Sequence, residues 1–599
     1  MEFEAYAEPL PDETPVVPVY NPDTNRVEIP DKEGFTITSN GADLEQIVAD
    51  DLTVHKPLTA KDVKLALKMK NNLTGGETLT EEYTISIPGL HDNSTGNEKP
   101  QVIPEITEWY SDSTENFTLT DQARIVIGSE ELAYAATEFQ KDLEDITGKK
   151  LEVVTGGEPE AGDFYFRLGS EDTMMGDEGY HLVIGDSVLI DAIHTTGAYW
   201  STRTILQALK LSSGGNTLPC GEARDYPKYK VRGFVYDVGR KPVSMDMLQD
   251  IVKNMSWYKM NDFQVHLSDN YIFLEDYQNS SDPDPADAYD AYSGFRLESS
   301  IANEEGKTLA SDDYHYSKQE FQEFIQNSRN YGVNIVPELD VPAHAMGITE
   351  VFPEYAVNGW NPRFKERSIV DHLDISRQEV IDFTEGIFDD YTKDGTFDSQ
   401  TVVHVGADEF EAGTTAYRNL LNQLIPHVKK TNTVRFWGGL TWLKDNPITQ
   451  IIPEAVEDVQ INLWARSWAD GKEMYDMGYD LINTQDEYLY MVPSGNGSRG
   501  AYGDYLNKNS IFNEFSPNRV AVKGGFTTIP AGDKQMLGAA YAIWNDNIDK
   551  RATGMTEADE FKRFFDSLAL MSEKCWANGK EKGSVASIDA LASQISTAP

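Results

Sequence analysis

The clearest pattern in the chain is an alternation of short apolar runs with amphipathic stretches that begins at residue 231. The apolar runs read VRGFVYD, DFQVHL, VNIVPEL, TVVHVGA, VRFWGG, VQINLW, DLINTQ and GAAYAIW. Stretches with helical spacing, such as SMDMLQDIVKNMSWYK and SKQEFQEFIQNSRNYG, lie between them. Eight strands that alternate with helices predict a (β/α)8 TIM barrel, to which we assign residues 226–580. The stretch 270–312 interrupts this rhythm and predicts a long loop at the mouth of the barrel.

The pattern before the barrel predicts two smaller domains, so the fold class is α/β with an added β-sandwich. Short alternating runs separated by turn residues, such as GFTITSNG and EEYTISIPG, predict an immunoglobulin-like β-sandwich. Strand-like YHLVIGDSVLIDA and helix-like ELAYAATEFQKDLEDITG then predict a small α/β domain. The predicted boundaries are 1–15 for a disordered lead-in, 16–89 for the β-sandwich, 90–115 for a linker, 116–225 for the α/β domain and 581–599 for a C-terminal tail.

The charge of the chain restricts its partners. The 599 residues include 51 Lys and Arg against 99 Asp and Glu, which gives a net charge of −48 spread along the sequence. Such a charge repels nucleic acid and anionic membranes, so neither is an expected partner. No stretch approaches the roughly 18 consecutive apolar residues of a membrane span. The first residues lack the basic flank and apolar run of a signal peptide, so we expect any targeting segment to lie outside this chain.

Polar and aromatic side chains follow the predicted barrel strands, and the carboxyl ends of such strands carry function in this fold. A single His or Trp at a strand end more often packs or makes a local hydrogen bond, and an acidic pair in so acidic a chain is often solvated surface. Their joint placement favours a site where carboxylates supply acid and base groups and Trp rings stack on sugars. The strand-end residues are Asp237, Arg240, His266, Asp269, Glu338, Asp340, His344, His404, Asp408, Glu409, Trp437, Trp464, Asp486, Tyr488, Trp544 and Asp546.

Metal binding is the competing interpretation of this set. The Asp, Glu and His residues are scattered singly over the strands, and neither an HExxH motif nor the spacing of an EF-hand loop occurs. The only cysteines, Cys220 and Cys575, exclude a disulfide framework and a cysteine-rich zinc cluster, and we expect both to be buried free thiols. The sequence therefore predicts no metal and no cofactor.

Several of these segments resemble glycoside hydrolase family 20, the β-N-acetylhexosaminidases and lacto-N-biosidases. The matching stretches are RGFVYDVGR, KMNDFQVHLSDN, GVNIVPELDVPAHA, HVGADEF, GGLTW, the segment around Tyr488 and AIWND. The preceding stretches YHLVIGDSVLIDA and GAYWSTRTILQAL are similar to the accessory domain of the family, so the resemblance covers about residues 120–580. It implies a retaining mechanism in which the 2-acetamido oxygen of the substrate replaces an enzyme nucleophile.

The resemblance also implies roles for individual residues. Glu409 would be the general acid and then the base, Asp408 would orient the acetamido N–H and stabilise positive charge, and Tyr488 would hydrogen-bond the acetamido oxygen. Because successive residues of a strand point to opposite faces, the chain must bend after the strand to present both carboxylates. The expected substrate-binding residues are Arg240, Gln264, His344, His404, Trp437, Trp464, Asp486, Trp544 and Asp546, with the three tryptophans as walls of the sugar pocket.

Three positions depart from the family pattern, and two of them bear on the substrate. Ala407 replaces the second glycine of the common HxGGDE motif, which we expect to matter little. Asp546 stands where a glutamate commonly grips the 4- and 6-hydroxyls of a terminal sugar, and Gln264 stands where a histidine is usual. Both features resemble the lacto-N-biosidase branch, which releases Gal-β1,3-GlcNAc from the non-reducing end of oligosaccharides or glycoconjugates.

Two alternatives stay open. Because Arg240 is retained, an enzyme that releases single β-GlcNAc or GalNAc residues is the first. A catalytically dead, glycan-binding adhesin is the second, and the presence of the acid, the orienting carboxylate and the tyrosine disfavours it. From this class of substrate we expect a bacterial, monomeric protein that is extracellular or associated with the cell wall.

Overall fold

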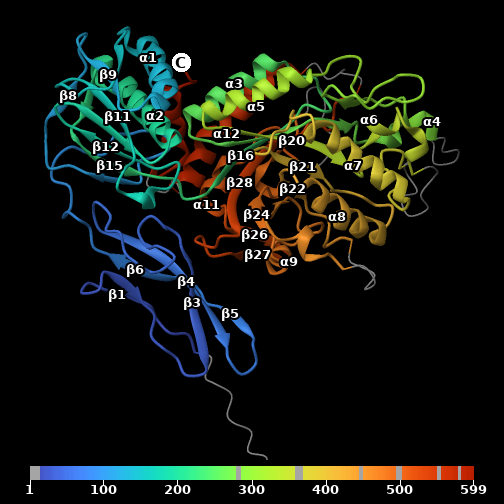
Figure 1. Cartoon of the computed structure of the whole chain (residues 1–599), viewed down its shortest axis with the longest axis horizontal. Coiled ribbons are helices and arrows are strands. Elements are labelled where there is room, and N and C mark those ends of the chain that lie inside the picture. Colours follow the sequence, from blue (N-terminus) through green and yellow to red (C-terminus); the bar gives the residue numbers. More distant parts are fainter. Residues whose placement is uncertain are drawn as a thin grey trace, which may run out of the picture.

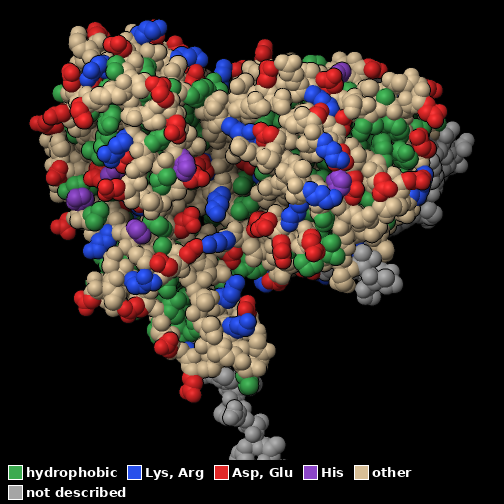
Figure 2. Space-filling model, in the orientation of Figure 1, with side chains coloured by type: hydrophobic (Ala, Val, Ile, Leu, Met, Phe, Trp, Pro, Cys, Tyr) green, Lys and Arg blue, Asp and Glu red, His purple; other side chains and the backbone are tan. Residues whose placement is uncertain are grey.

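The computed structural model contains three domains and describes most of the chain (Figure 1). The described residues are 14–277, 285–357, 369–443, 450–493, 502–549, 555–577 and 582–599. Among them, no helix is both long and apolar enough to cross a membrane. Acidic side chains are spread over all three domains and interspersed with basic ones on the face in Figure 2, which agrees with the dispersed negative charge of the sequence.

The predicted (β/α)8 barrel is confirmed. Its eight parallel strands are β16 (Val231–Asp237), β17 (Asp262–His266), β20 (Asn334–Val341), β21 (Val402–Gly406), β22 (Thr433–Trp437), β23 (Val459–Leu463), β24 (Asp480–Asn483) and β28 (Met536–Ile543). The pairing of β16 with β28 closes the barrel. Each strand corresponds to one of the eight apolar runs in the sequence. The side chains of these strands face either the barrel interior or the surrounding helices, and both sides are buried. Their sequences are therefore almost continuously apolar.

Amphipathic helices surround the barrel, and several begin at caps that the sequence supplies. They are α3 (Met245–Trp257), α5 (Lys318–Asn330), α7 (Gln378–Thr392), α8 (Thr414–Val428), α9 (Gly471–Met477), α11 (Lys508–Glu514) and α12 (Glu557–Trp576). Ser244 and Ser317 accept hydrogen bonds from backbone N–H groups in the first turns of α3 and α5. Thr556 and Asp559 form a capping box at the start of α12. Such caps satisfy N–H groups that have no partner within the helix.

The described parts of 270–312 form an irregular excursion between β17 and α5, as predicted for a long loop. It contains η4 (Leu274–Tyr277), α4 (Pro285–Ala288) and a short antiparallel pair, β18 (Ser268–Asn270) with β19 (Ser293–Phe295). Two short helices also follow barrel strands, α6 (Met346–Thr349) after β20 and α10 (Asp486–Leu489) after β24. The two-residue strand β25 (Tyr490–Met491) comes next and pairs with the end of β28.

The accessory domain is a seven-stranded mixed sheet with two helices, α1 (Ala133–Thr147) and α2 (Thr195–Leu211). Its strands, in spatial order, are β10 (Glu152–Thr155), β9 (Arg124–Ile127), β11 (Phe164–Leu168), β13 (Val188–Ala192), β12 (Tyr180–Ile184), β15 (Gly221–Asp225) and β7 (Glu108–Tyr110). A separate pair joins β8 (Asn116–Thr118) to β14 (Thr217–Pro219).

Two of the predicted boundaries need correction. The range 90–115, predicted as a linker, contains β7, and the nearby side chains of Val102, Ile103 and Ile106 are buried in the core shared with the barrel. The predicted tail 581–599 contains the helix α13 (Val585–Ile595), which contacts α12 and α2. At three residues, β7 is too short to show a periodicity, and α13 buries only Ile588 and Ile595, which leaves a weak helical pattern.

The N-terminal domain consists of two small antiparallel sheets over one core. The first pairs β1 (Val19–Asn21) with β2 (Arg26–Glu28), and the second contains β3 (Phe35–Ala42), β4 (Lys61–Asn71), β5 (Glu77–Leu79) and β6 (Tyr83–Ile87). Both sheets contribute apolar side chains to a single buried cluster, so the domain is a six-stranded sandwich within 16–89. Most of the predicted lead-in, 1–15, lies outside the described residues.

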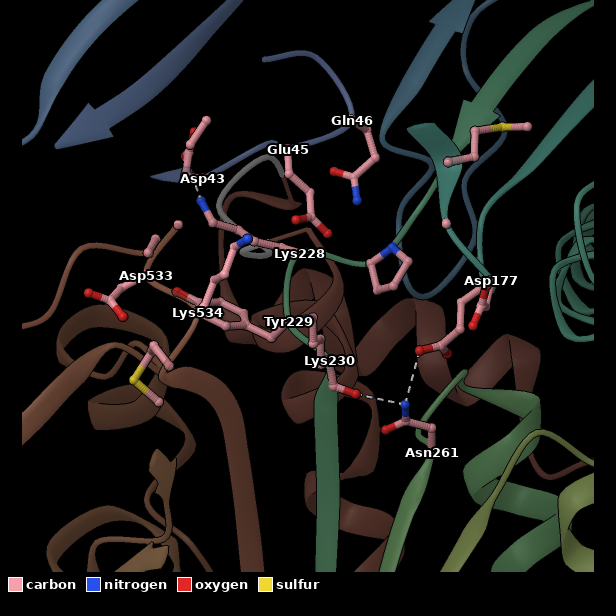
Figure 3. Close-up of a pocket in the computed structure, with 18 of the residues that line it drawn as sticks. Asp43, Glu45, Gln46, Asp177, Lys228, Tyr229, Lys230, Asn261, Asp533 and Lys534 are labelled. Carbon is pink, nitrogen blue, oxygen red and sulfur yellow. Dashed lines mark hydrogen bonds and ion pairs between the residues drawn. The ribbon is translucent and has the colours of Figure 1, made fainter. Parts of the chain in front are cut away.

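A polar cavity of about 560 Å³ lies where the three domains meet (Figure 3). Lys228 pairs with Asp43 of the sandwich at 2.8 Å. Asn40 of the sandwich donates a hydrogen bond to Asp533 at 2.7 Å, just before β28. Because Asp533 precedes its strand, this junction is at the amino ends of the barrel strands, away from the mouth. The sandwich is therefore attached to the barrel floor.

Candidate active site

A second cavity, of about 250 Å³, lies at the carboxyl ends of the barrel strands. Its lining combines carboxylates, histidines, an arginine and several aromatic rings, whereas the described lining of the larger junction cavity contains a single aromatic ring, Tyr229. The lining residues are Arg240, His266, Asp269, Ile272, Phe273, Asp340, His344, Asp408, Glu409, Trp464, Tyr490, Val492, Tyr502, Trp544 and Asp546. We therefore take this cavity as the candidate active site.

A strained turn after β21 presents the acid pair to the cavity. Gly406, Ala407 and Glu409 have φ angles of 68°, 80° and 41°, in the left-handed region. A Cβ atom on Gly406 would lie 1.8 Å from Asp340 Oδ1, so a glycine is required there. Two hydrogen bonds anchor Ala407, because its N–H donates to Val341 O at 2.8 Å and its carbonyl accepts from the Tyr417 hydroxyl at 2.6 Å. The turn thus allows both adjacent carboxylates to line the cavity.

The Asp408 side chain has one carboxylate oxygen that is available to accept a hydrogen bond from a ligand. Its Oδ1 is buried and has no hydrogen-bond partner among the described residues. Burial, together with the nearby charge of Glu409, raises the pKa of Asp408 to about 6. A buried carboxylate oxygen without a hydrogen-bond donor is costly unless water or a ligand supplies one. The arrangement is therefore suited to hold an N–H or O–H group of a ligand.

His344 connects the acid pair to a buried carboxylate. Its Nδ1 lies 3.1 Å from Asp269, and its Nε2 lies 3.3 Å from Glu409 and 3.9 Å from Asp408. Burial alone would lower the pKa of His344, but Asp269 and Asp408 raise it well above its ordinary value. The imidazolium thus hydrogen-bonds Asp269 through Nδ1 and lies at ion-pair distance from Glu409, which places the two carboxylates on either side of one positive charge.

A second charged group forms the opposite wall. Arg240 lies 2.8 Å from Asp269, 2.9 Å from Asp237 and 3.3 Å from Asp546. Its Nε also donates to the Asn270 carbonyl at 2.7 Å. Burial raises the pKa of Asp546 to about 6, against the lowering effect of Arg240. The Asp546 side chain keeps 23% of its surface exposed, so this wall presents a carboxylate to a ligand.

Aromatic rings form the remaining walls. Trp464 and Trp544 line the cavity, and Trp464 Nε1 donates to the Gly438 carbonyl at 3.0 Å. The Tyr490 ring lies 5.5 Å from those of Trp544 and Tyr502. Flat, rigid rings around a polar centre suit the apolar faces of a pyranose.

Tyr488 was predicted as the catalytic tyrosine, but the structure places its side chain outside the cavity lining, which contains Tyr490. The Tyr488 ring packs near Phe515, outside the lining, and its hydroxyl donates to Glu514 at 3.1 Å. Tyr490 lines the cavity instead. Tyr488 belongs to the short helix α10 and Tyr490 to the extended β25, so the two side chains take different directions although they are two residues apart.

Four other predicted binding residues lie outside the lining. Gln264 donates to Glu338 at 2.7 Å, Trp437 Nε1 donates to Glu338 at 2.5 Å, and His404 Nδ1 lies 3.5 Å from Glu338. These three side chains are buried beneath the cavity floor. Asp486 accepts a hydrogen bond from the Tyr502 hydroxyl at 2.8 Å, behind the wall. All four therefore support lining residues rather than line the cavity themselves.

The remaining predicted residues are brought together as expected: Asp408, Glu409, Arg240, His344, Trp464, Trp544 and Asp546 all line the cavity. Sequence reasoning missed Ile272, Phe273, Tyr490, Val492 and Tyr502. Except for Tyr490, which neighbours the predicted tyrosine, these residues come from irregular loops whose sequences carry no motif.

Two overlapping groups could bring metal-binding atoms together, His266 with Asp269 and Asp340, and Asp340 with His344 and Asp408. Burial lowers the pKa of His266 and His344, but neighbouring carboxylates raise both well above the ordinary value. A protonated imidazole has no lone pair for a metal. Without a metal, these two imidazoles therefore hold protons between the carboxylates.

A parallel barrel with an acid pair and aromatic walls at its mouth is typical of carbohydrate-active enzymes. Residues 229–437 match the family model "Glycosyl hydrolase family 20, catalytic domain", and residues 99–226 match "Glycosyl hydrolase family 20, domain 2". The two matches together cover more than half of the chain. This chain belongs to glycosyl hydrolase family 20.

The relatives agree with this assignment. A lacto-N-biosidase of Bifidobacterium bifidum is 25% identical over 80% of this chain and 40% of its own length. Beta-hexosaminidase 1 of Coccidioides posadasii is 24% identical over 53% of this chain and 54% of its own length. The chain thus spans about half or less of the length of these relatives. The Streptomyces plicatus N-acetyl-beta-hexosaminidase structure has a TM-score of 0.63 at 18% identity, covering 83% of this chain and 96% of that one.

Proposed function

We propose that this protein is a retaining exo-glycosidase that removes a unit containing N-acetylglucosamine from the non-reducing end of a glycan. The observation that carries the proposal is the turn after β21, which presents Asp408 and Glu409 side by side to an aromatic-walled cavity. The Oδ1 atom of Asp408, which accepts no hydrogen bond from the described residues, further supports this proposal. Family membership and the names of the relatives point to the same class of reaction.

The chemistry follows from the positions of these groups. Glu409, held by His344, donates a proton to the glycosidic oxygen as the bond breaks and later accepts one from water. Asp408 accepts a hydrogen bond from the acetamido N–H and stabilises the positive charge that develops as the acetamido oxygen attacks the anomeric carbon. Tyr490, whose pKa burial raises well above 10, remains a donor and contacts that oxygen.

The finer proposal is that the released unit is the disaccharide Gal-β1,3-GlcNAc. Asp546 is one methylene shorter than the glutamate expected there, and it draws back toward Arg240. Beyond it, Ile272, Phe273 and Tyr502 extend the cavity lining with side chains that can accommodate a second ring. The similarity to a lacto-N-biosidase over 80% of the chain supports this choice.

Release of a single β-N-acetylhexosamine is the second candidate. Its support is Arg240, which is buried at the wall and positioned to bind sugar hydroxyls, and the beta-hexosaminidases among the relatives. In this case Arg240 and Asp546 would bind the terminal hydroxyls of one sugar.

Hydrolysis of two p-nitrophenyl glycosides, β-GlcNAc and β-lacto-N-bioside, tests both candidates. Release from the disaccharide alone supports the biosidase, and strong release from β-GlcNAc supports the hexosaminidase. We expect Glu409→Gln to reduce kcat on the preferred glycan at least a hundredfold while sugar binding, measured by calorimetry, persists. Unchanged hydrolysis by that variant would refute the assignment of the acid, and no hydrolysis of either substrate would leave glycan binding as the function.

A further inference from the structure

We propose that Trp468 and Trp442 form a stacking platform for the sugars on the leaving-group side of the scissile bond. This inference rests on the proposed glycosidase function and extends it to the part of the glycan that is not released. The two side chains continue outward from Trp464, which lines the cavity. The Trp464 and Trp468 rings are stacked, with centroids 6.0 Å apart and planes at 23°, and the Trp468 and Trp442 rings are 5.2 Å apart at 35°.

The outer end of this row is open to solvent. Trp442 exposes 43% of its surface, which makes it one of few large apolar side chains so exposed among the described residues, while Trp464 exposes 8%. An apolar surface with a polar rim next to a cavity commonly binds a ligand. The row therefore leads from the buried sugar pocket to an exposed aromatic face.

The platform is held in place by its backbone. The N–H groups of Thr441 and Trp442 donate to the Trp468 carbonyl at 2.9 and 3.3 Å. The Thr441 hydroxyl accepts from the Asp470 N–H at 2.8 Å and donates to Glu473 at 2.9 Å. These bonds join the segment after β22 to the segment after β23. A surface fixed in this way loses little conformational entropy when a ligand binds.

The position of the platform sets which part of a glycan it would contact. A Cβ atom on Gly439 would lie 3.3 Å from the Ala407 carbonyl, so the segment that carries Trp442 starts against the turn of the acid pair. Around the barrel, β22 and β23 follow β21, which precedes Glu409. Arg240 and Asp546 follow β16 and β28 at the barrel closure. A leaving sugar that extends from Glu409 over the segments after β22 and β23 would therefore reach the two tryptophans.

The chemistry of the platform selects a pyranose with an apolar face. Trp rings bind the C–H faces of such sugars by dispersion and burial of apolar surface, without selecting a particular hydroxyl pattern. The expected ligand is thus the first or second sugar of the glycan that is released as the leaving group. A substrate with a small aglycone gains nothing from it.

Matched substrates separate this inference from the proposed function. The assay measures kcat/KM on methyl β-lacto-N-bioside and on the tetrasaccharide in which the same disaccharide is linked β1,3 to lactose. A second pair, methyl β-GlcNAc and β-GlcNAc linked β1,3 to lactose, covers the alternative specificity. Methyl glycosides are used because a p-nitrophenyl ring would itself stack on tryptophan. The variants are Trp442→Ala, Trp442→Phe and, as a control, Tyr505→Ala, which removes another exposed aromatic side chain with 44% exposure.

We expect Trp442→Ala to lower the ratio of kcat/KM for the oligosaccharide over the methyl glycoside about tenfold, an effect comparable to the loss of one stacked ring. Trp442→Phe and Tyr505→Ala should change this ratio less than about twofold, since the first keeps a stacking ring and the second removes a ring that packs on Arg563 and is no part of the platform. An unchanged ratio in Trp442→Ala, with both substrates cleaved, overturns the platform and leaves the glycosidase intact. Failure of the wild-type protein to cleave either pair refutes both proposals.

Discussion

Replacing Tyr490 by Phe removes one hydroxyl from the wall of the candidate active site and tests the reassignment from Tyr488. The Tyr490 ring is held between those of Trp544 and Tyr502, each 5.5 Å away. A phenylalanine keeps these ring contacts, so the variant should fold normally. Burial raises the pKa of Tyr490 well above 10, so at neutral pH the lost group is a hydrogen-bond donor.

The expected loss of kcat follows from the position of the Tyr490 hydroxyl relative to the charge that develops in the transition state. The acetamido oxygen becomes partly bonded to the anomeric carbon in the transition state, and a donor at that oxygen orients it for attack. Loss of one preorganised donor in a dry site costs about 3 kcal/mol, or roughly 10²-fold in kcat. Tyr488→Phe is the matched control, because that hydroxyl bonds Glu514 at 3.1 Å outside the cavity lining. We expect it to alter kcat less than about twofold.

The assay is steady-state hydrolysis of the preferred p-nitrophenyl glycoside by the wild-type protein and both variants, with thermal unfolding to confirm equal stability. A fall in kcat for Tyr490→Phe with little change in KM indicates an interaction made in the transition state. Wild-type activity in Tyr490→Phe together with a large loss in Tyr488→Phe would refute the reassignment.

Two further predictions concern specificity and stability. Asp546→Glu restores the longer side chain at the cavity wall, so we expect the ratio of kcat/KM for β-lacto-N-bioside over β-GlcNAc to fall at least tenfold; a ratio that does not fall would contradict the role of Asp546. Burial raises the pKa of Glu573 to about 8, so its contribution to stability is complete below the unfolded pKa near 4.5 and is lost as pH rises toward 8. We expect Glu573→Gln to raise the unfolding free energy by up to about 3 kcal/mol at pH 7 and by little at pH 5, measured by denaturant titration; an equal gain at both pH values would refute this reasoning.

The barrel could be predicted because its strands are buried on both faces. Their apolar runs are therefore nearly continuous and are separated by amphipathic helices, which is a strong local signal. The strand β7 gave no such signal. It has three residues, and it exists because Glu108 and Tyr110 pair with β15, far along the chain. Pairing between distant segments is a tertiary effect that local patterns do not record.

The acid pair could be predicted because both residues belong to one short motif next to a strand. Which of Tyr488 and Tyr490 lines the cavity could not be predicted, since this depends on where α10 ends. The chain leaves the helix after Leu489 and becomes extended at Tyr490, which pairs with Ala542 of β28. Two tyrosines separated by one residue thus face different environments, and only the three-dimensional pairing with β28 decides which one reaches the cavity.

The layered interior of the barrel explains why Gln264, Trp437 and His404 lie outside the cavity lining, although they were predicted to bind the substrate. The strand register aligns His266 with Glu338 and Glu338 with His404, so one layer of polar side chains lies beneath the mouth. Burial would raise the pKa of Glu338, but His266 and His404 lower it to about 2, so this carboxylate stays charged. It accepts the hydrogen bonds of Gln264 and Trp437. A residue type suited to bind sugar is equally suited to satisfy a buried carboxylate, and strand-end position alone does not distinguish the two layers. Gln264 therefore belongs to the buried layer, whereas Asp546 lines the cavity.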